Sequence, residues 1–180
     1  FNLSTWSQER GNFFDYEILL KGVNKNAITH TAQYIAFPSQ DELNAIQHGE
    51  TQHGNESIGH FNLKLCAAWY IKKTHKKDVF IEHNYRGNRP DIISKDYQII
   101  VECGNTDPKK ATDYLSSKVP CSIFYILGYS YSGIIADSLM LHRFTRGENW
   151  GKFLEWRNRI IEEIVWKPIN SMPFPGEEKK

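Results

Sequence analysis

Three features that mark specialised proteins are scarce in this 180-residue chain: cysteine, long apolar runs and an excess of one charge. The three cysteines form no Cys-x-x-Cys pair, so neither a disulfide framework nor a zinc knuckle is expected, and a cytoplasmic or other intracellular location is favoured. Apolar runs such as Ile123 to Leu127 are far shorter than the roughly 20 residues that cross a bilayer, so no membrane association is expected. A net charge of +1 excludes a strongly basic coat for nucleic acid but permits a local basic patch.

The remaining composition is that of an ordinary globular protein. Hydrophobic residues make up 40% of the chain and charged residues 24%, which excludes a disordered, collagen-like or coiled-coil protein. We expect a single domain over residues 1–180, with a core over residues 57–128 and helical extensions on either side. The chain begins with Phe1 rather than Met, which suggests that it is part of a larger protein.

Hydrophobic patterns and turn residues predict an α/β fold, in which helices flank a mixed central sheet. A helix after the N-cap Ser57 extends to about Lys73, and a second helix opens at Asp107-Pro108 and ends before Pro120. The expected strands are Val79 to Tyr85, Asp91 to Ser94, Tyr97 to Cys103 and Ser122 to Leu127. Helical material is expected after these strands, and its last helix presents one apolar face with Trp150, Leu154, Ile161 and Val165.

Two carboxylates lie at one end of the expected hairpin. With the turn at Lys95-Asp96, Asp91 pairs with residues 100–102, which places it beside Glu102. On the second strand Glu102 shares its face with Ile100, whereas Val101 faces the other way. Neighbouring acids repel each other unless a cation lies between them, and oxygen ligands suit Mg²⁺ or Mn²⁺. These positions therefore predict a metal site.

Further residues fit a metal-assisted phosphodiester hydrolysis. The Cys103 carbonyl and the Glu82 carboxylate are possible additional ligands, and His60 is a further candidate on the preceding helix. Lys64 lies one turn after His60, so both project from one helix face and could reach a metal or a phosphate. A cationic group is needed for the charge of the transition state, and Lys109 and Lys110 in the following helix can supply it.

The region from Ser57 to Leu127 resembles the PD-(D/E)XK nuclease superfamily. The resemblance implies a restriction-endonuclease-like fold in which Asp91 and Glu102 bind divalent metal and a lysine assists the attacking water. The lysine of the family falls at position 104, where this chain has Gly104. Many divergent members carry the lysine on the following helix, which implies Lys110 first, then Lys109, then Lys118.

Two subpatterns within that superfamily are similar to this chain. One is the His-x-x-x-Lys helix of competence-associated and restriction-related members, followed by a Glu, Arg-Pro-Asp and a second Glu. The other is the order His, Glu, Pro-Asp, Glu and helical Lys of viral cap-snatching endonucleases. The residues that match are His60, Lys64, Glu82, Arg89-Pro90-Asp91 and Glu102.

These observations predict a divalent-metal-dependent endonuclease in restriction, defence or DNA processing, with DNA favoured over RNA as the partner. Candidate nucleic-acid contacts are Lys72, Lys73, Arg86 and Arg89. The alternatives are a decayed nuclease-fold module that binds nucleic acid or protein, and a cap-snatching-like RNA endonuclease domain of a larger enzyme. A homodimer is also possible, because the tryptophans of the last helix are typical of an interface.

Overall fold

The computed structural model describes residues 13–47, 54–107, 109–116, 121–163 and 173–177. The helices in this part of the chain are α2 (Phe13–Asn24), α3 (Gln40–Ile46), α4 (Ile58–His75), α5 (Lys109–Ser116) and α6 (Trp150–Glu163). The strands are β1 (Ile28–Ile35), β2 (Val79–Ile81), β3 (Ile92–Ser94), β4 (Ile99–Cys103), β5 (Ile123–Ser132) and β6 (Ile135–Arg146).

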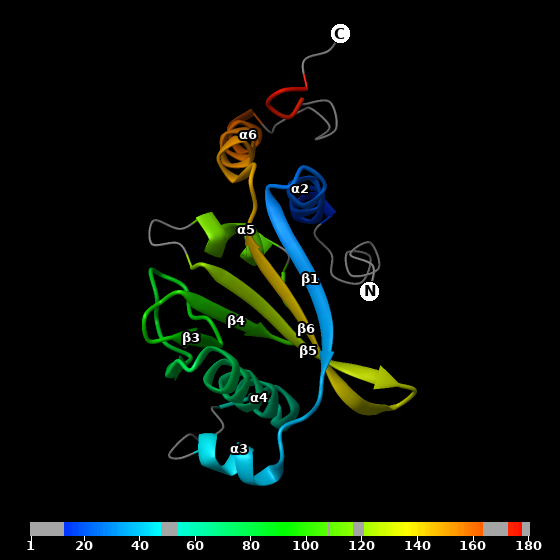
Figure 1. The fold of residues 1–180 in the computed structure, drawn as a ribbon, viewed down its shortest axis with the longest axis vertical. Helices are drawn as coiled ribbons and strands as arrows, with labels where there is room; N and C mark the ends of the chain where they lie inside the picture. Colours follow the sequence, from blue (N-terminus) through cyan, green and yellow to red (C-terminus); the bar gives the residue numbers. More distant parts are fainter. Residues whose placement is uncertain (1–12, 48–53, 108, 117–120, 164–172, 178–180) are drawn as a thin grey trace.

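The six strands form one open mixed sheet in the order β1-β6-β5-β4-β3-β2 (Figure 1). Only β4 and β5 run parallel, because α5 crosses over between them, and the other neighbours are antiparallel. Figure 1 shows α4 on one side of the sheet and α2, α5 and α6 on the other. The expected α/β class with helices around a mixed sheet is thus confirmed at this level.

Each face of the sheet has its own hydrophobic core. Ile100 and Phe124 pack with Trp156 of α6 on one face, whereas Val101 packs with Ala67 of α4 on the other. Alternate residues of β4 therefore point to opposite faces, as the sequence pattern predicts. All five residues of β4 are buried, so this strand is a rigid support for any side chain at its end.

The helix α4 begins where its cap is expected. The Ser57 side chain accepts a hydrogen bond from the His60 backbone N–H at 3.1 Å, which satisfies one of the free donors at the helix start. The helix ends at His75, two residues beyond the expected end, because Lys76 takes a left-handed conformation with φ of 55°.

The expected helical material after residue 127 is wrong for residues 128–146. This segment contains the second half of β5 and the 12-residue strand β6, and residues 28–35 form the edge strand β1. In β6, Leu139 and Leu141 are buried on one face while His142 and Phe144 are buried on the other. A strand covered on both faces has no clear apolar alternation, which explains why the pattern did not reveal it.

The expected apolar face of the last helix is confirmed only in part. Trp150 packs against the core as expected, but the buried residues in the described part of α6 are Phe153, Trp156 and Ile160, which share one face at helical spacing. Ile161 is half exposed, whereas Val165 lies outside the described residues. The helix therefore presents a neighbouring face, turned by about one residue from the expected one.

Two strands are shorter than expected because single residues take left-handed backbone conformations. Strand β2 ends at Ile81, since Glu82 has a φ of 51°. Strand β4 begins at Ile99, because Tyr97 has a φ of 61° in the turn that precedes it. In the part of the chain that the structure describes, no helix has both the length and the apolar content needed to cross a bilayer.

Candidate active site

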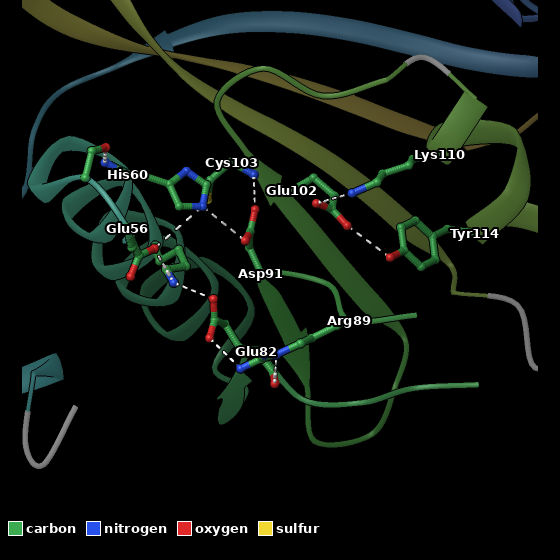
Figure 2. Close-up of polar contacts among 11 residues, drawn as sticks. Glu56, His60, Glu82, Arg89, Asp91, Glu102, Cys103, Lys110 and Tyr114 are labelled. Carbon is green, nitrogen blue, oxygen red and sulfur yellow. Dashed lines mark hydrogen bonds and ion pairs between the residues drawn. The ribbon is translucent and has the colours of Figure 1, made fainter. Parts of the chain in front are cut away.

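Strands β3 and β4 bring Asp91 and Glu102 to one edge of the sheet. The pairing of Ile92 with Val101 places residue 91 directly across from residue 102, as the hairpin count predicts. Figure 2 shows the two acidic side chains as neighbours at this edge. The two side chains point in different directions. Asp91 contacts His60 of α4, whereas Glu102 contacts Lys110 of α5.

The Asp91 carboxylate is held by two groups. Its Oδ2 accepts a hydrogen bond of 2.7 Å from the backbone N–H of Cys103, and its Oδ1 lies 3.3 Å from Nε2 of His60 (Figure 2). The Asp91 backbone carbonyl accepts a hydrogen bond of 2.9 Å from the N–H of Glu82. Asp91 is therefore fixed both at its backbone and at its side chain.

The Glu102 carboxylate is buried and held by two residues of α5. Its Oε2 accepts a hydrogen bond of 2.9 Å from Nζ of Lys110, and its Oε1 accepts one of 3.0 Å from the Tyr114 hydroxyl (Figure 2). Lys110 and Tyr114 lie one helical turn apart and so face the same strand end. Burial raises the pKa of Glu102; the Asp91 charge adds to this effect, and Lys110 and Tyr114 oppose it.

A lysine is absent from position 104, where Gly104 stands, and Lys110 of α5 contacts the strand end instead. Gly104 has a φ of 74°, in the left-handed region that a residue with a side chain enters only at a cost of about 1–2 kcal/mol. This turn takes the chain away from β4 immediately after Cys103. A lysine at position 104 would be strained, whereas Lys110 reaches the same carboxylate from α5.

A buried network of charges lies beside Asp91 on the α4 side. Lys64 is fully buried and forms ion pairs with Glu56 and, at 2.8 Å, with Glu82. Arg89 donates to the other carboxylate oxygen of Glu82 at 2.8 Å and to its backbone carbonyl at 3.1 Å. Burial by itself lowers the pKa of Lys64, but the hydrogen bonds and charges of the two glutamates outweigh it and raise the pKa.

This network bears on two of the candidate site residues. The Glu82 side chain forms ion pairs with Lys64 and Arg89 rather than pointing to Asp91 and Glu102 as an additional ligand would. The Lys64 ammonium is enclosed by carboxylates rather than directed to solvent. Both residues therefore hold the loop between β2 and β3, which ends at Asp91.

Lys118 lies outside the described residues, and the other predicted cations on α4, on α5 and at Arg86 do not converge on this edge. Lys109 is exposed at the first position of α5, and its backbone N–H donates to Oδ1 of Asp107. Lys72 and Lys73 lie in the last turn of α4, about 18 Å along the helix from His60 at 1.5 Å per residue. The Arg86 guanidinium lies over the Tyr85 ring, 5.7 Å from its centroid.

Two residues of the site were not among the candidates. Tyr114 binds Glu102, and its spacing of four residues from Lys110 is the signal that points to it. Glu56 binds Lys64 from the segment just before the N-cap of α4, and no helical spacing points to it. Burial raises the pKa of the Tyr114 hydroxyl, so this group is a neutral hydrogen-bond donor.

The donor set fits a hard divalent cation that keeps several waters. Within the described residues, no three side chains of His, Cys, Asp or Glu form a metal-binding group. Mg²⁺ is commonly bound by only one or two carboxylates together with water and phosphate, which Asp91 and Glu102 can provide. The Cys103 backbone, whose N–H binds Asp91, lies at the same strand end, so its carbonyl is a further candidate ligand. Burial raises the pKa of the Cys103 thiol well above its ordinary value, so its sulfur is a poor ligand.

Comparisons with protein-family models, with curated proteins and with solved structures found no match for this chain. The main elements of the site are two acids at neighbouring strand ends and a lysine from the next helix.

Proposed function

We propose that the protein is a divalent-metal-dependent endonuclease with a restriction-endonuclease-like fold. The observation that carries this proposal is the contact of 2.9 Å between Nζ of Lys110 and Oε2 of Glu102, at the strand end where Asp91 lies opposite. Two acids and one ammonium on rigid elements are the groups that metal-assisted phosphodiester hydrolysis requires. A solvated surface pair would not need a buried acid, yet Glu102 is only 4% exposed.

The residues suited to hold a metal are Asp91, Glu102 and the carbonyl of Cys103. A Mg²⁺ or Mn²⁺ ion bound there would supply Lewis-acid activation of the phosphodiester and of the attacking water. The protein supplies the fixed positions of these oxygens, because β4 is buried along its whole length. His60 contacts Asp91 and orients its carboxylate from the α4 side.

Lys110 supplies the positive charge. Its side chain is 45% exposed, so its ammonium can contact a phosphate on the solvent side while it remains bonded to Glu102. Fixed donors aimed at the oxygens on which charge develops are usually the largest contribution of a protein to such a reaction. Tyr114 binds the other oxygen of Glu102 and so fixes the orientation of that carboxylate.

Lys64 acts in this proposal as a positioning residue. It binds Glu82, whose N–H donates to the carbonyl of Asp91, so the buried network fixes the backbone that carries the acid. Arg89 closes the same loop by its two contacts with Glu82. The positive charge of Lys64 is needed because Glu56 and Glu82 both approach its ammonium group and would otherwise repel each other.

The test is a cleavage panel with the purified protein. Labelled single- and double-stranded DNA and RNA are incubated with Mg²⁺, Mn²⁺ or EDTA, and Glu102→Gln is compared with the surface control Glu42→Gln. We expect cleavage by the wild type and by Glu42→Gln with metal only, and a loss of at least about 100-fold for Glu102→Gln. Equal cleavage by Glu102→Gln would contradict the proposal.

A second candidate function is a nuclease-fold module that binds nucleic acid without cutting it. It is favoured by Gly104, which stands where the related nucleases carry their lysine. The same panel distinguishes the two candidates. Binding of an oligonucleotide with no cleavage in any metal would support the module and contradict the endonuclease.

A further inference from the structure

Exposed apolar side chains gather around one hairpin of the molecule. In the described part of the chain seven large hydrophobic side chains are exposed, and only Ile161 of α6 lies elsewhere. The other six, called here the hairpin patch, are Tyr34, Phe37, Ile58, Tyr131, Ile134 and Ile135. Such a concentration marks an interaction surface, whereas single exposed apolar residues are ordinary.

The contacts show that these segments are neighbours. Phe37, just after β1, and Tyr131 each have their ring centroid 6.1 Å from that of Tyr129 on β5. The Tyr129 hydroxyl donates a hydrogen bond of 2.7 Å to the carbonyl of Gly59, next to Ile58 at the start of α4. Tyr129 therefore joins the hairpin to the end of β1 and to α4.

The same hairpin has an open backbone edge. Strand β1 pairs with β6 only from Leu139 to Arg146, while β6 begins four residues earlier at Ile135. Residues 135–138 therefore have β5 on one side and, among the described residues, no strand on the other. Figure 1 shows this end of the hairpin projecting past the end of β1. Open edges with apolar side chains pair readily with another strand.

The charge of the hairpin favours a protein partner over nucleic acid. Between Leu127 and Leu141 the only charged residue is Asp137, and there is no lysine or arginine. Nucleic acid is bound largely through cations that neutralise its phosphates, and this segment offers none. The exposed side chains are instead aliphatic and aromatic, and Ile134 and Ile135 are 95% and 75% exposed.

We propose that the hairpin patch is the interface of a two-fold homodimer, in which residues 135–138 of β6 pair antiparallel with the same residues of a second copy. An antiparallel strand pair is compatible with a two-fold axis, so one open edge can serve both copies. In such a pair the backbone of residues 135–138 and the exposed apolar side chains beside it would be covered together. The dimer does not depend on the proposed cleavage.

Sedimentation velocity on the full chain tests this proposal. We expect the wild type to form a dimer at about 10–100 µM, and Ile134→Asp/Ile135→Asp to sediment as a monomer, with a dissociation constant raised at least about 100-fold. Ile161→Asp, a change at the exposed site outside the patch, is the matched control and stays dimeric. Circular dichroism of each variant checks that the fold is retained, which the exposure of these side chains leads us to expect.

Cysteine crosslinking tests the strand pairing itself. The three native cysteines are buried, so a cysteine introduced at each of positions 135 to 138 in turn provides an accessible thiol. Under mild oxidation, one or two neighbouring positions near the two-fold axis are expected to form covalent dimers, and Ser116→Cys on α5 is not. A monomeric wild type at 100 µM would overturn the proposal. In that case the affinity for a single-stranded oligonucleotide in EDTA is compared between the wild type and Ile134→Asp/Ile135→Asp. A lower affinity of the double variant would assign the patch to nucleic acid instead.

Discussion

Nζ of Lys110 lies 2.9 Å from Oε2 of Glu102, although the lysine belongs to α5 and the acid to the end of β4. The two residues are joined by a left-handed turn at Gly104, which directs the chain from the strand toward the helix. The helix thereby supplies a cation to a buried carboxylate.

Replacement of Lys110 should remove the proposed catalytic cation without loss of the fold. Its side chain is 45% exposed, so Lys110→Met leaves the core unchanged, and we expect kcat to fall by about 10²–10³-fold. Lys109→Met is the matched control, because Lys109 is its exposed neighbour on the same helix, and it should change kcat less than about threefold. Steady-state cleavage of a labelled oligonucleotide measures both. Equal losses in the two variants would contradict the assignment of Lys110.

A lysine placed at position 104 should not replace Lys110. Gly104→Lys forces a residue with a side chain to a φ of 74°, which should lower the free energy of unfolding by about 1–2 kcal/mol. We expect the double variant Gly104→Lys/Lys110→Met to be as inactive as Lys110→Met alone. Urea unfolding measures the free energy of unfolding of Gly104→Lys, and oligonucleotide cleavage measures the activity of the double variant. Recovery of activity in the double variant would show that position 104 can carry the cation.

The pairing of Asp91 with Glu102 could be predicted from the sequence because it depends on local counting. A turn at Lys95-Asp96 fixes the register of a short hairpin, and β4 has a continuous apolar sequence that identifies it. The choice of Lys110 as the candidate lysine depends on the resemblance to nucleases that carry the lysine on the following helix. Its spacing from Tyr114 then indicates which face of α5 meets Glu102.

Other features depend on contacts between distant parts of the chain. The middle of strand β6 is covered on both faces. Successive side chains there point to opposite faces, but apolar and polar residues do not alternate along the sequence. Lys64 is buried only because Glu56 and Glu82 approach it from segments before and after α4. A pattern along the helix predicts an exposed lysine there, since an isolated buried charge is too costly.

Removal of the Lys64 charge should disturb both stability and the placement of Asp91. Lys64→Met leaves two glutamates facing each other in a buried position, and the loss of such a pair typically costs about 3–5 kcal/mol. The double variant Lys64→Met/Glu56→Gln, in which one repelling charge is also removed, should regain part of that loss. Urea unfolding of both variants measures the difference.

The positioning role of Lys64 needs a second readout. In the folded double variant we expect the kcat of cleavage to fall at least about tenfold while KM changes little, because the loop that carries Asp91 is no longer fixed. A variant that is destabilised but has an unchanged kcat would show that Lys64 serves stability alone.

Acidification should destabilise the protein through His30. Burial lowers the pKa of His30 below its ordinary value of 6.5, so the unfolded chain takes up a proton first as the pH falls. The free energy of unfolding should therefore decrease below about pH 6.5, by at most about 1.4 kcal/mol per pH unit from this residue. His30→Phe keeps the stacking on Phe144 and should weaken this dependence. Urea unfolding at pH 7.5 and 5.5 checks it, and an identical slope in the variant would contradict it.

The central claim is that Asp91 and Glu102 together bind a divalent metal, and isothermal titration with Mn²⁺ tests it most directly. The wild type should bind Mn²⁺ at millimolar or lower concentration, and so should the control Asp78→Asn, whose acid is exposed and distant from Glu102 in the sheet. Asp91→Asn and Glu102→Gln should each lower the affinity at least about tenfold. Binding that is absent from the wild type, or equal in all four proteins, would contradict the account.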